Sequence, residues 1–423
     1  MDRLLVTGGV RLEGSVRISG AKNSALKLMA AALLAPGRTV LHNVPRIQDC
    51  ITMGQVLEHL GAEVAWDGGE VTIDAAGLTS VEAPYELVRR MRASIVVLGP
   101  LLARAGQARV AMPGGDNIGS RPIDLHVSGL RKMGADISSE HGFLEARAPH
   151  GLRGAPVTLD YPSVGATENL MMAAVAARGT TVIDNAAREP EIADIADHLA
   201  AMGARIEGAG TSTLEIEGVE AFTPAPHGVI PDRIEAGTFA AAAVATRGDV
   251  TLTGARPEHL GLFLDKLSDA GARIDLTGDG LRVRQESRPA AVDFVTLPYP
   301  GLATDFQPIL MAMLAVADGT SIATENVFES RFLYVPELRR MGASIDVEGH
   351  HAVIRGMARL SAAPVQALDI RAGAAMVIAG LCADGVTEVE DMHHVDRGYE
   401  DFEEKLTALG AEVRRERELV TLP

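Results

Sequence analysis

Positively charged side chains stand directly before apolar stretches at two places in the chain. Lys22 lies in SGAKNS, before the apolar run 25–34, and Arg371 lies in DIRAG, before another such run. If each run is a helix, its first turn offers free N–H groups and the positive end of the helix dipole, which suit a phosphate or carboxylate. Alternatively, Lys22 is a solvated lysine at an ordinary helix start. The parallel between the two positions favours helix starts that face one anion site.

Three further arginines have the same binding chemistry available. Arg92 opens an apolar stretch, Arg331 lies in ENVFESRF, and Arg397 lies in DRGYE. A guanidinium group binds carboxylate and phosphate in a bidentate way. Arg331 and Arg397 could instead form structural ion pairs with Glu329 and Glu400.

Two carboxylates stand where a proton could be transferred. Asp305 precedes the apolar run 309–317, where it could cap a helix or act as a general base. Asp116 lies in PGGDNIGSRP, residues 113–122, whose glycines and flanking prolines favour an irregular loop with hinge-like freedom. With Arg121, it could close over a ligand and exclude water. The alternative is a surface loop with solvated charges.

Composition limits the kinds of partner. The 423 residues suit two domains, and the net charge of −17 argues against nucleic acid or an anionic membrane as a partner. The two cysteines, Cys50 and Cys382, indicate no disulfide framework, and the 12 histidines show no metal-ligand spacing. No apolar run approaches the ~18 residues of a spanning helix, and the start of the chain lacks a signal-peptide core. We therefore expect a soluble, cytoplasmic protein.

The elements that must position these residues recur six times. A helical stretch ends in Gly-Ala and is followed by an alternating strand pattern, as in LEHLGAEV and LRKMGADI. Each glycine stands where a helix end needs the left-handed backbone conformation. The repeat length is 68 to 73 residues, with the glycines at positions 61, 134, 203, 271, 342 and 410.

A second set of glycines runs in phase with the first. An apolar helix rich in Ala and Met is predicted to end at Gly37, Gly106, Gly179, Gly248, Gly319 and Gly385, each time followed by a strand such as 39–42, 180–183 or 321–324. Because this helix is apolar on every face, it must be buried on every side. One repeat is therefore an apolar helix, a strand, an amphipathic helix and a hairpin. Six such repeats suit two globular domains better than a solenoid scaffold, the alternative, whose repeats are usually ~20–50 residues long.

Ten short motifs occur along nearly the whole chain. They are SGAKNSAL (19–26), MRASIVVLGPLLAR (91–104), IGSRPIDLHVSGL (118–130), SVGATEN (163–169), NAAREPEI (185–192), PDRIEAGT (231–238), TDFQP (304–308), ENVFESRF (325–332), DIRAGAA (369–375) and DRGYE (396–400). Singly several are weak, but ten in order are specific. Taken in order, they resemble the UDP-N-acetylglucosamine 1-carboxyvinyltransferase family.

The resemblance implies an α/β fold of two inside-out α/β domains, each of three βαβαββ units. Residues 22–229 would form the domain that carries the Asp116 loop, and residues 1–21 plus 230–423 would form the other. The active site would lie in the cleft between them. The implied reaction moves the enolpyruvyl group of phosphoenolpyruvate to the 3-hydroxyl of UDP-N-acetylglucosamine, the first committed step of peptidoglycan synthesis, with no metal or organic cofactor.

The resemblance also assigns roles to residues. Lys22, Arg121 and Arg397 would bind phosphoenolpyruvate, while Arg331 and Arg371 would hold its carboxylate side and the intermediate. Asn23, Asp305 and the backbone near Val327 would hold the sugar, and Asp369 is counted with the substrate-binding residues. The uridine diphosphate would lie against Arg92, Pro122, Leu125, His126, Ser163, Val164 and Gly165. Family members often have Lys where this chain has Tyr161, so one diphosphate contact differs.

The implied mechanism is addition followed by elimination, with Asp305 as base toward the hydroxyl and Asp116 as acid at C3 of phosphoenolpyruvate. Most family members have cysteine in place of Asp116, so thiol chemistry is excluded here and resistance to fosfomycin is expected. Three alternatives remain. One is an enolpyruvyl transferase of specialised metabolism with another nucleotide acceptor, and one is a non-enzymatic repeat scaffold. The shikimate-pathway enzyme shares the fold but has a Ser-Lys-Ser type segment in place of Ala21-Lys22-Asn23.

Overall fold

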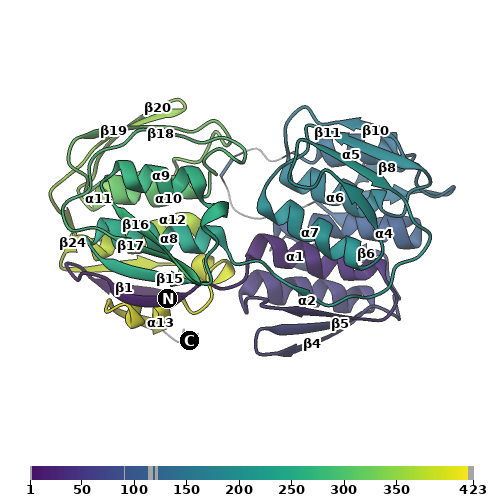
Figure 1. The fold of residues 1–423 in the computed structure, drawn as a ribbon, viewed down its shortest axis with the longest axis horizontal. Helices are drawn as coiled ribbons and strands as arrows, with labels where there is room; N and C mark the ends of the chain where they lie inside the picture. Colours follow the sequence, from purple (N-terminus) through teal and green to yellow (C-terminus); the bar gives the residue numbers. More distant parts are fainter. Residues whose placement is uncertain (1, 90, 113–117, 120–121, 418–423) are drawn as a thin grey trace. The chain divides into compact units, whose positions relative to one another are not determined.

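The computed structural model describes residues 2–89, 91–112, 118–119 and 122–417, and of Arg92 the backbone only. Asp116 and Arg121, to which roles are assigned above, lie outside the described residues. The described chain divides into two compact units, each with its own apolar core. Unit A comprises residues 20–112 and 122–230, and unit B comprises residues 2–19, 118–119 and 231–417 (Figure 1).

Unit A contains three successive sets of helices and strands. They are α1 (Lys22–Ala31), η1 (Ala32–Leu34), β3 (Arg38–His42), α2 (Gln48–Leu60), β4 (Glu63–Asp67) and β5 (Glu70–Asp74); β6 (Glu82–Ala83), α3 (Tyr85–Val88), η2 (Arg92–Val97), α4 (Leu98–Ala105), β7 (Gln107–Ala111), α5 (Asp124–Lys132), β8 (Asp136–Glu140) and β9 (Phe143–Arg147); and β10 (Pro156–Thr158), α6 (Val164–Ala174), β11 (Thr180–Asp184), α7 (Pro190–Ala201), β12 (Arg205–Glu207), β13 (Thr213–Glu217) and β14 (His227–Gly228).

Unit B has the same organisation. Its elements are β1 (Asp2–Thr7) and β2 (Glu13–Arg17); α8 (Arg233–Ala245), β15 (Asp249–Thr253), η3 (Pro257–His259), α9 (Gly261–Asp269), β16 (Arg273–Thr277) and β17 (Gly280–Arg284); β18 (Phe294–Val295), α10 (Phe306–Leu314), β19 (Thr320–Thr324), α11 (Val335–Arg340), β20 (Ser344–Glu348) and β21 (His351–Arg355); and β22 (Leu360–Ser361), β23 (Pro364–Gln366), α12 (Ile370–Leu381), β24 (Ala383–Asp384), β25 (Val386–Glu390), η4 (Met392–Arg397), α13 (Phe402–Ala408) and β26 (Glu412–Arg417).

Six four-stranded sheets in the described residues share one strand order, three in each unit. In the sheet β10-β11-β13-β12, β10 is parallel to β11, which pairs antiparallel with β13 of the hairpin β12–β13. The others are β14-β3-β5-β4, β6-β7-β9-β8, β2-β15-β17-β16, β18-β19-β21-β20 and β23-β25-β1-β26. The predicted βαβαββ arrangement is therefore confirmed in space in both units, although three of the sheets take one strand from a distant part of the chain.

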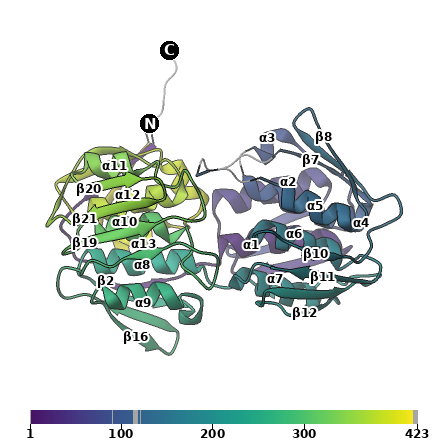
Figure 2. The ribbon, with the colours of Figure 1, turned by 90° about the horizontal axis from the view of Figure 1, so that it is seen from above.

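The apolar helices form the centre of each unit. Every residue of α8, α10 and α12 is buried, and the three helices pack side by side inside a shell of strands and outer helices (Figures 1 and 2). In unit A, α4 packs against α6 and against η1, which continues α1. Small side chains permit this packing: a Cβ on Gly99 of α4 would lie 2.3 Å from the backbone oxygen of Asn169 in α6. This confirms the inside-out architecture.

The two sets of glycines had different outcomes. The glycines of the Gly-Ala set all have the predicted left-handed conformation, with φ from 85° to 107°. The second set follows the prediction less closely, because α10 ends at Leu314 and a turn intervenes before Gly319. In the fourth repeat the left-handed residue is Arg247, with φ 56°. Gly248 has another role there, since a Cβ would approach the Leu12 carbonyl oxygen to 2.4 Å.

The prediction of a hairpin in every repeat is wrong for the sixth. Its sheet takes β1 from the start of the chain as the partner of both β25 and β26, in the place that the second hairpin strand has in the other sheets. Similarly, β2 supplies the outer strand of the fourth repeat, and β14 supplies that of the first. The pairing of strands distant in sequence thus closes each unit.

Candidate active site

The start of α12 in unit B brings together three of the predicted residues. The Asp369 carboxylate caps the helix, because its Oδ1 accepts from the N–H groups of Arg371 at 2.8 Å and Ala372 at 2.9 Å. Its Oδ2 lies 3.7 Å from the Arg331 guanidinium. Asp369 therefore has protein partners on both oxygens and positions Arg331. The carboxylate that Arg331 contacts is Asp369, so the alternative pairing with Glu329 is wrong.

Asp305 pairs with Arg371 and does not cap a helix. The N-cap alternative is wrong, because Asp305 precedes α10 but its side chain accepts no capping hydrogen bond. Instead, Arg371 Nε donates to Asp305 Oδ1 at 2.8 Å. Burial alone would raise the pKa of Asp305, but the charges of Arg371 and Arg331 and this hydrogen bond hold the pKa well below its usual range. The carboxylate is therefore ionised at neutral pH.

The Arg371 guanidinium retains binding capacity. Its side chain is 4% exposed and lies over the Tyr399 ring, 5.1 Å from the ring centroid. Among the described residues its Nη1 has no hydrogen-bond partner. A buried donor on a charged group is costly to leave unpaired, so this atom favours an anionic ligand. Arg397 ends η4 two residues before Tyr399 and is half-buried.

A buried carboxylate that the sequence analysis did not single out holds the segment near Val327. Glu325 Oε1 accepts from the N–H groups of Val327 at 2.7 Å and Phe328 at 3.1 Å, and Oε2 accepts from Thr304 Oγ1 at 2.9 Å. The predicted backbone contact at Val327 is therefore limited to its carbonyl group.

Lys22 is the first residue of α1 in unit A, as predicted, but it is not solvated. The residue is 8% exposed, and its Nζ lies 2.8 Å from Oδ2 of Asp49 on α2. The next residue, Asn23, is half-buried. Asp194 of α7 accepts from Ser24 Oγ and lies 2.7 Å from His227 Nε2, so it ties this helix start to β14. Neither Asp49 nor Asp194 could be predicted as a partner of this helix start, because both lie on other helices.

The predicted nucleotide-binding residues meet where α5 and α6 begin. Ser163 caps α6, accepting from the Ala166 N–H at 3.3 Å. The His126 ring packs closely against Gly165, where a Cβ would lie 3.3 Å from the ring. The side-chain amide of Asn169 orients this ring, because its Nδ2 lies 3.0 Å from His126 Nδ1. The Oδ1 of Asn169 also accepts from the Gly99 N–H at 2.6 Å. Val164 and Leu125 are half-buried, Pro122 is exposed, and Arg92 begins η2.

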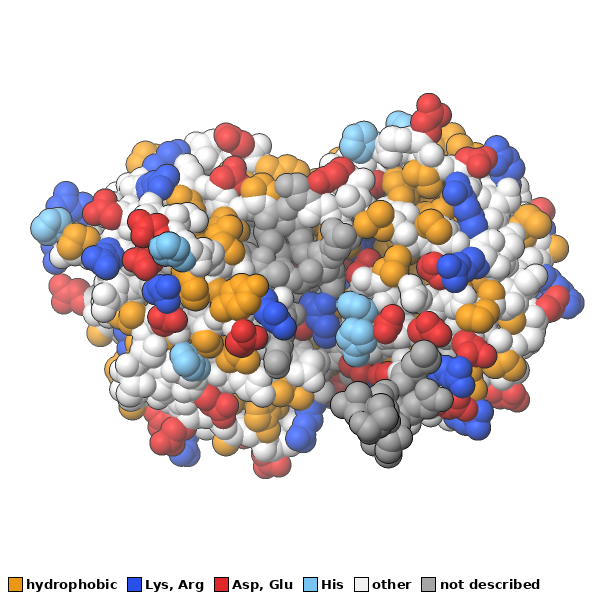
Figure 3. Space-filling view, turned by 180° about the vertical axis from the view of Figure 1, so that it is seen from behind, with side chains coloured by type: hydrophobic (Ala, Val, Ile, Leu, Met, Phe, Trp, Pro, Cys, Tyr) orange, Lys and Arg blue, Asp and Glu red, His pale blue; other side chains and the backbone are white. Residues whose placement is uncertain are grey.

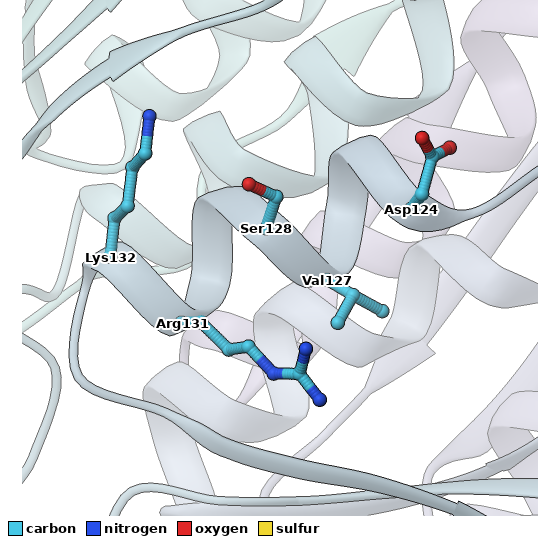
Figure 4. A pocket seen from close by; sticks show the side chains of 5 residues that line it. All are labelled: Asp124, Val127, Ser128, Arg131 and Lys132. Atoms are coloured by element: carbon cyan, nitrogen blue, oxygen red, sulfur yellow. The ribbon is translucent and has the colours of Figure 1, made fainter.

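The outer face of α5 has an open hollow that is separate from these residues. Asp124, Val127, Ser128, Arg131 and Lys132 line it, and their side chains project from one helix without converging (Figure 4). Over the visible face of each unit, acidic and basic side chains alternate without a large patch of one sign (Figure 3). Within the described ranges, no cluster of His, Cys, Asp and Glu could hold a metal ion, and no helix is long and apolar enough to cross a membrane.

Comparison with known proteins identifies the family. Residues 6–406 match the family described as EPSP synthase (3-phosphoshikimate 1-carboxyvinyltransferase). The chain is 56% identical over 414 residues to UDP-N-acetylglucosamine 1-carboxyvinyltransferase of Corynebacterium jeikeium, covering 98% of this chain and 99% of that relative. The relative of the same name in Nocardia farcinica is also 56% identical, over 420 residues and 98% of each chain. The chain belongs to the UDP-N-acetylglucosamine 1-carboxyvinyltransferase family.

Solved structures share the fold at lower identity. The enolpyruvyl transferase NikO from Streptomyces tendae has a TM-score of 0.88 and 28% identity, covering 98% of both chains. EPSP synthase from Acinetobacter baumannii has a TM-score of 0.77 and 18% identity, covering 99% of this chain and 100% of that one, and shows the fold alone. The family relationship makes the chain an enzyme, a transferase, and excludes the non-enzymatic scaffold.

Proposed function

We propose that this enzyme transfers the enolpyruvyl group of phosphoenolpyruvate to the 3-hydroxyl of UDP-N-acetylglucosamine and releases phosphate. The observation that supports this most directly is 52–56% identity, over 98% of the chain, to relatives named for that activity. This identity is about twice that to NikO, at 28%, and higher still than that to EPSP synthase, at 18%. The reaction would be the first committed step of peptidoglycan synthesis and so serve cell-wall formation, cell shape and division in the cytoplasm.

Each unit would supply part of the binding machinery. Phosphoenolpyruvate carries a phosphate and a carboxylate, and the described residues offer buried cations for both: Lys22 in unit A, and Arg331 and Arg371 in unit B. Arg371 has an unused donor at Nη1 among the described residues. Fixed cations in a site from which water is excluded stabilise the charge that develops in the transition state. Arg397 and Arg121 would complete this set.

Asp305 would take the proton of the acceptor hydroxyl. The carboxylate is ionised at neutral pH, as a base must be, although a low pKa makes it a weak base. A bound anion beside Arg371 and Arg331 would offset their charge and raise the pKa of Asp305 toward the working range. Asp305 would therefore become an effective base only after the anionic substrate has bound. Asp116 would deliver the proton to C3 of phosphoenolpyruvate.

Asn23, the Val327 carbonyl group and the α5–α6 residues would hold the nucleotide sugar. His126, Ser163 and Gly165 lie at two helix starts, where N–H groups suit a diphosphate. Tyr161 is 41% exposed where many relatives are expected to carry lysine, so a lysine contact is absent at this position.

The test is phosphate release with phosphoenolpyruvate and each of three acceptors: UDP-N-acetylglucosamine, UMP and shikimate 3-phosphate. We expect release with the first only, and product mass should show addition of one enolpyruvyl group. Release with UMP but not with the nucleotide sugar would refute the proposed acceptor and favour an enzyme of specialised metabolism.

A further inference from the structure

A buried carboxylate without a part in the proposed reaction lies between two segments that carry predicted site residues. Glu325 directly follows β19 and is 1% exposed. Its two oxygens accept three hydrogen bonds, from Thr304 Oγ1, the Val327 N–H and the Phe328 N–H, at 2.7 to 3.1 Å. Burying a carboxylate is costly unless it is well hydrogen-bonded, and these bonds meet that need.

The partners of Glu325 connect it to Asp305 and Arg331. Thr304 directly precedes Asp305, and its carbonyl oxygen accepts from Arg331 Nε at 3.4 Å. The Arg331 backbone N–H donates to the Phe328 carbonyl oxygen at 3.3 Å. Glu325 therefore holds the two segments from which the Asp305 carboxylate and the Arg331 guanidinium project.

The backbone at Glu325 is held at the end of the sheet β18-β19-β21-β20. The Glu325 N–H donates to the His350 carbonyl oxygen at 2.8 Å. The following residue, Asn326, donates from its backbone to Thr296 Oγ1 at 3.0 Å, and Thr296 is fully buried. A rigid element thus supports the side chain, which is what a precise site requires.

We propose that Glu325 is a positioning residue for the reaction: its carboxylate sets the orientation of Asp305 and Arg331 toward the acceptor hydroxyl and the intermediate. The proposal rests on the proposed function for the identity of the substrates. It differs from a purely structural role because all three side-chain hydrogen bonds go to site-bearing segments.

Glutamine at this position keeps the geometry and removes the charge. Its amide oxygen can accept from the N–H groups of Val327 and Phe328, and its amide nitrogen can donate to Thr304 Oγ1. Glu325→Gln should therefore keep kcat within about threefold of wild type and leave the pH profile unchanged. Glu325→Ala leaves all three donors without this partner, and we expect kcat to fall about 100-fold, the scale of a 1 Å misplacement.

Thr304 isolates one of the three bonds. Thr304→Val removes the hydroxyl at similar shape and should lower kcat roughly tenfold, the effect of one lost orienting hydrogen bond. Thr304→Ser keeps the hydroxyl and should resemble wild type.

Glu337→Ala provides the matched control in the same unit. Glu337 lies on α11, is 7% exposed and accepts from the Gln366 N–H at 3.1 Å, so it is another buried carboxylate bound to backbone. Its loss should lower the melting temperature as much as Glu325→Ala does and leave kcat unchanged. If both alanine variants lose stability and turnover in parallel, Glu325 is merely structural and the proposal is wrong. It is also wrong if Glu325→Gln is as inactive as Glu325→Ala.

Amide hydrogen exchange tests the geometry without turnover. The Val327 and Phe328 amides should exchange slowly in wild type and Glu325→Gln, and fast in Glu325→Ala. Slow exchange in Glu325→Ala would overturn the proposal. A wild-type enzyme that releases no phosphate with UDP-N-acetylglucosamine would refute the proposed function alone, and the exchange rates would still decide whether Glu325 holds these segments.

Discussion

At the scale of the residue, Lys22 interacts with a protein partner and, as proposed, with a substrate. Its Nζ lies 2.8 Å from Asp49 Oδ2, and both side chains are at least nine-tenths buried. Removing one member of a buried ion pair leaves the other charge without that partner. A loss of activity in a Lys22 variant therefore has two sources, which a second substitution can separate.

We expect Lys22→Ala to lower the free energy of unfolding by about 3 kcal/mol and to abolish most use of phosphoenolpyruvate. Lys22→Ala/Asp49→Asn should recover much of the stability, because the buried carboxylate is gone, but not kcat/KM for phosphoenolpyruvate. Urea unfolding and steady-state kinetics on wild type, both single variants and the double variant measure this. Recovery of kcat/KM in the double variant would show that Lys22 acts through Asp49 and not on the substrate.

Asp116 offers a second residue-scale test. Opening the epoxide of fosfomycin needs a strong nucleophile, and a carboxylate, protonated when it acts as an acid, is far weaker than a thiolate. We expect wild type to resist time-dependent inactivation, Asp116→Cys to turn over and become sensitive, and Asp116→Asn to lose most activity. Residual activity and intact mass after incubation with the drug and UDP-N-acetylglucosamine provide the readout. A covalent mass increase on wild type, with activity lost over time, would contradict the role of Asp116.

At the scale of the element, the ends of the helices show two uses of glycine. Gly61 adopts φ 103° to reverse the chain, whereas Gly248 permits close approach and leaves the left-handed turn to Arg247, at φ 56°. A side chain in the left-handed region costs roughly 1 kcal/mol relative to glycine. Arg247 is exposed, so its conformation rather than its packing should determine the effect of replacing it.

Arg247→Gly should therefore raise the free energy of unfolding by up to about 1 kcal/mol. Gly248→Ala should lower it by more than that, because its Cβ would approach the Leu12 carbonyl oxygen to 2.4 Å. Thermal unfolding of both variants measures the difference. If the loss of free energy of unfolding in Gly248→Ala is no larger than the gain in Arg247→Gly, close packing does not explain Gly248.

A buried ion pair links α1 to α6. Lys27 Nζ lies 3.3 Å from Glu168 Oε2, and Glu168 is fully buried. Burial raises the pKa of Glu168 from 4.5 to about 7, although Lys27 opposes the shift. Since the folded-state pKa is the higher one, this group stabilises the fold below pH 4.5, and the stabilisation is lost as pH rises through 7.

Glu168→Gln should remove this pH dependence. Relative to wild type, its free energy of unfolding should rise between pH 4.5 and pH 7 by up to about 3 kcal/mol. Glu215→Gln, an exposed position on β13, serves as the control and should follow wild type at both pH values. Denaturant unfolding at pH 5 and pH 7.5 measures the effect. A Glu168→Gln curve parallel to wild type would contradict a titration of this group in that range.

At the scale of the whole molecule, local signals sufficed for the repeat but not for its closure. The Gly-Ala helix ends predicted six repeats, because a few neighbouring residues are enough to recognise a left-handed helix end. The pairing of β1 with β26 could not be predicted, because strands about 410 residues apart are brought together only by packing. The proposed site divides in the same way. Lys22 and Arg371 can be proposed from their helix starts alone, whereas the role proposed for Glu325 depends on its hydrogen bond to Thr304, which only the fold brings close.

The closure of the sixth sheet makes a prediction about chain connectivity. Because Asp2 lies opposite Arg417 in adjacent antiparallel strands, a linker of about two to five residues can join them as a hairpin. New ends placed between Gly349 and His350, at the exposed turn of β20–β21, would give the fifth repeat the open hairpin that the sixth has now. If the six repeats are equivalent, this circular permutant should fold cooperatively and keep its turnover.

Two controls separate the effect of chain connectivity from the effects of the inserted linker and of the position of the chain break. Inserting the same linker at 349–350 without permutation should be harmless, since loop tips tolerate insertion. Opening the permutant between Val377 and Ile378 should prevent folding, because every residue of α12 is buried and a break there places charged ends in the core. Circular dichroism melts and phosphate release compare the three chains. If the permutant opened at 349–350 fails while the insertion variant folds, the covalent hairpin of the fifth repeat is required and the repeats are not interchangeable; if it folds, strand pairing alone closes the unit wherever the chain begins.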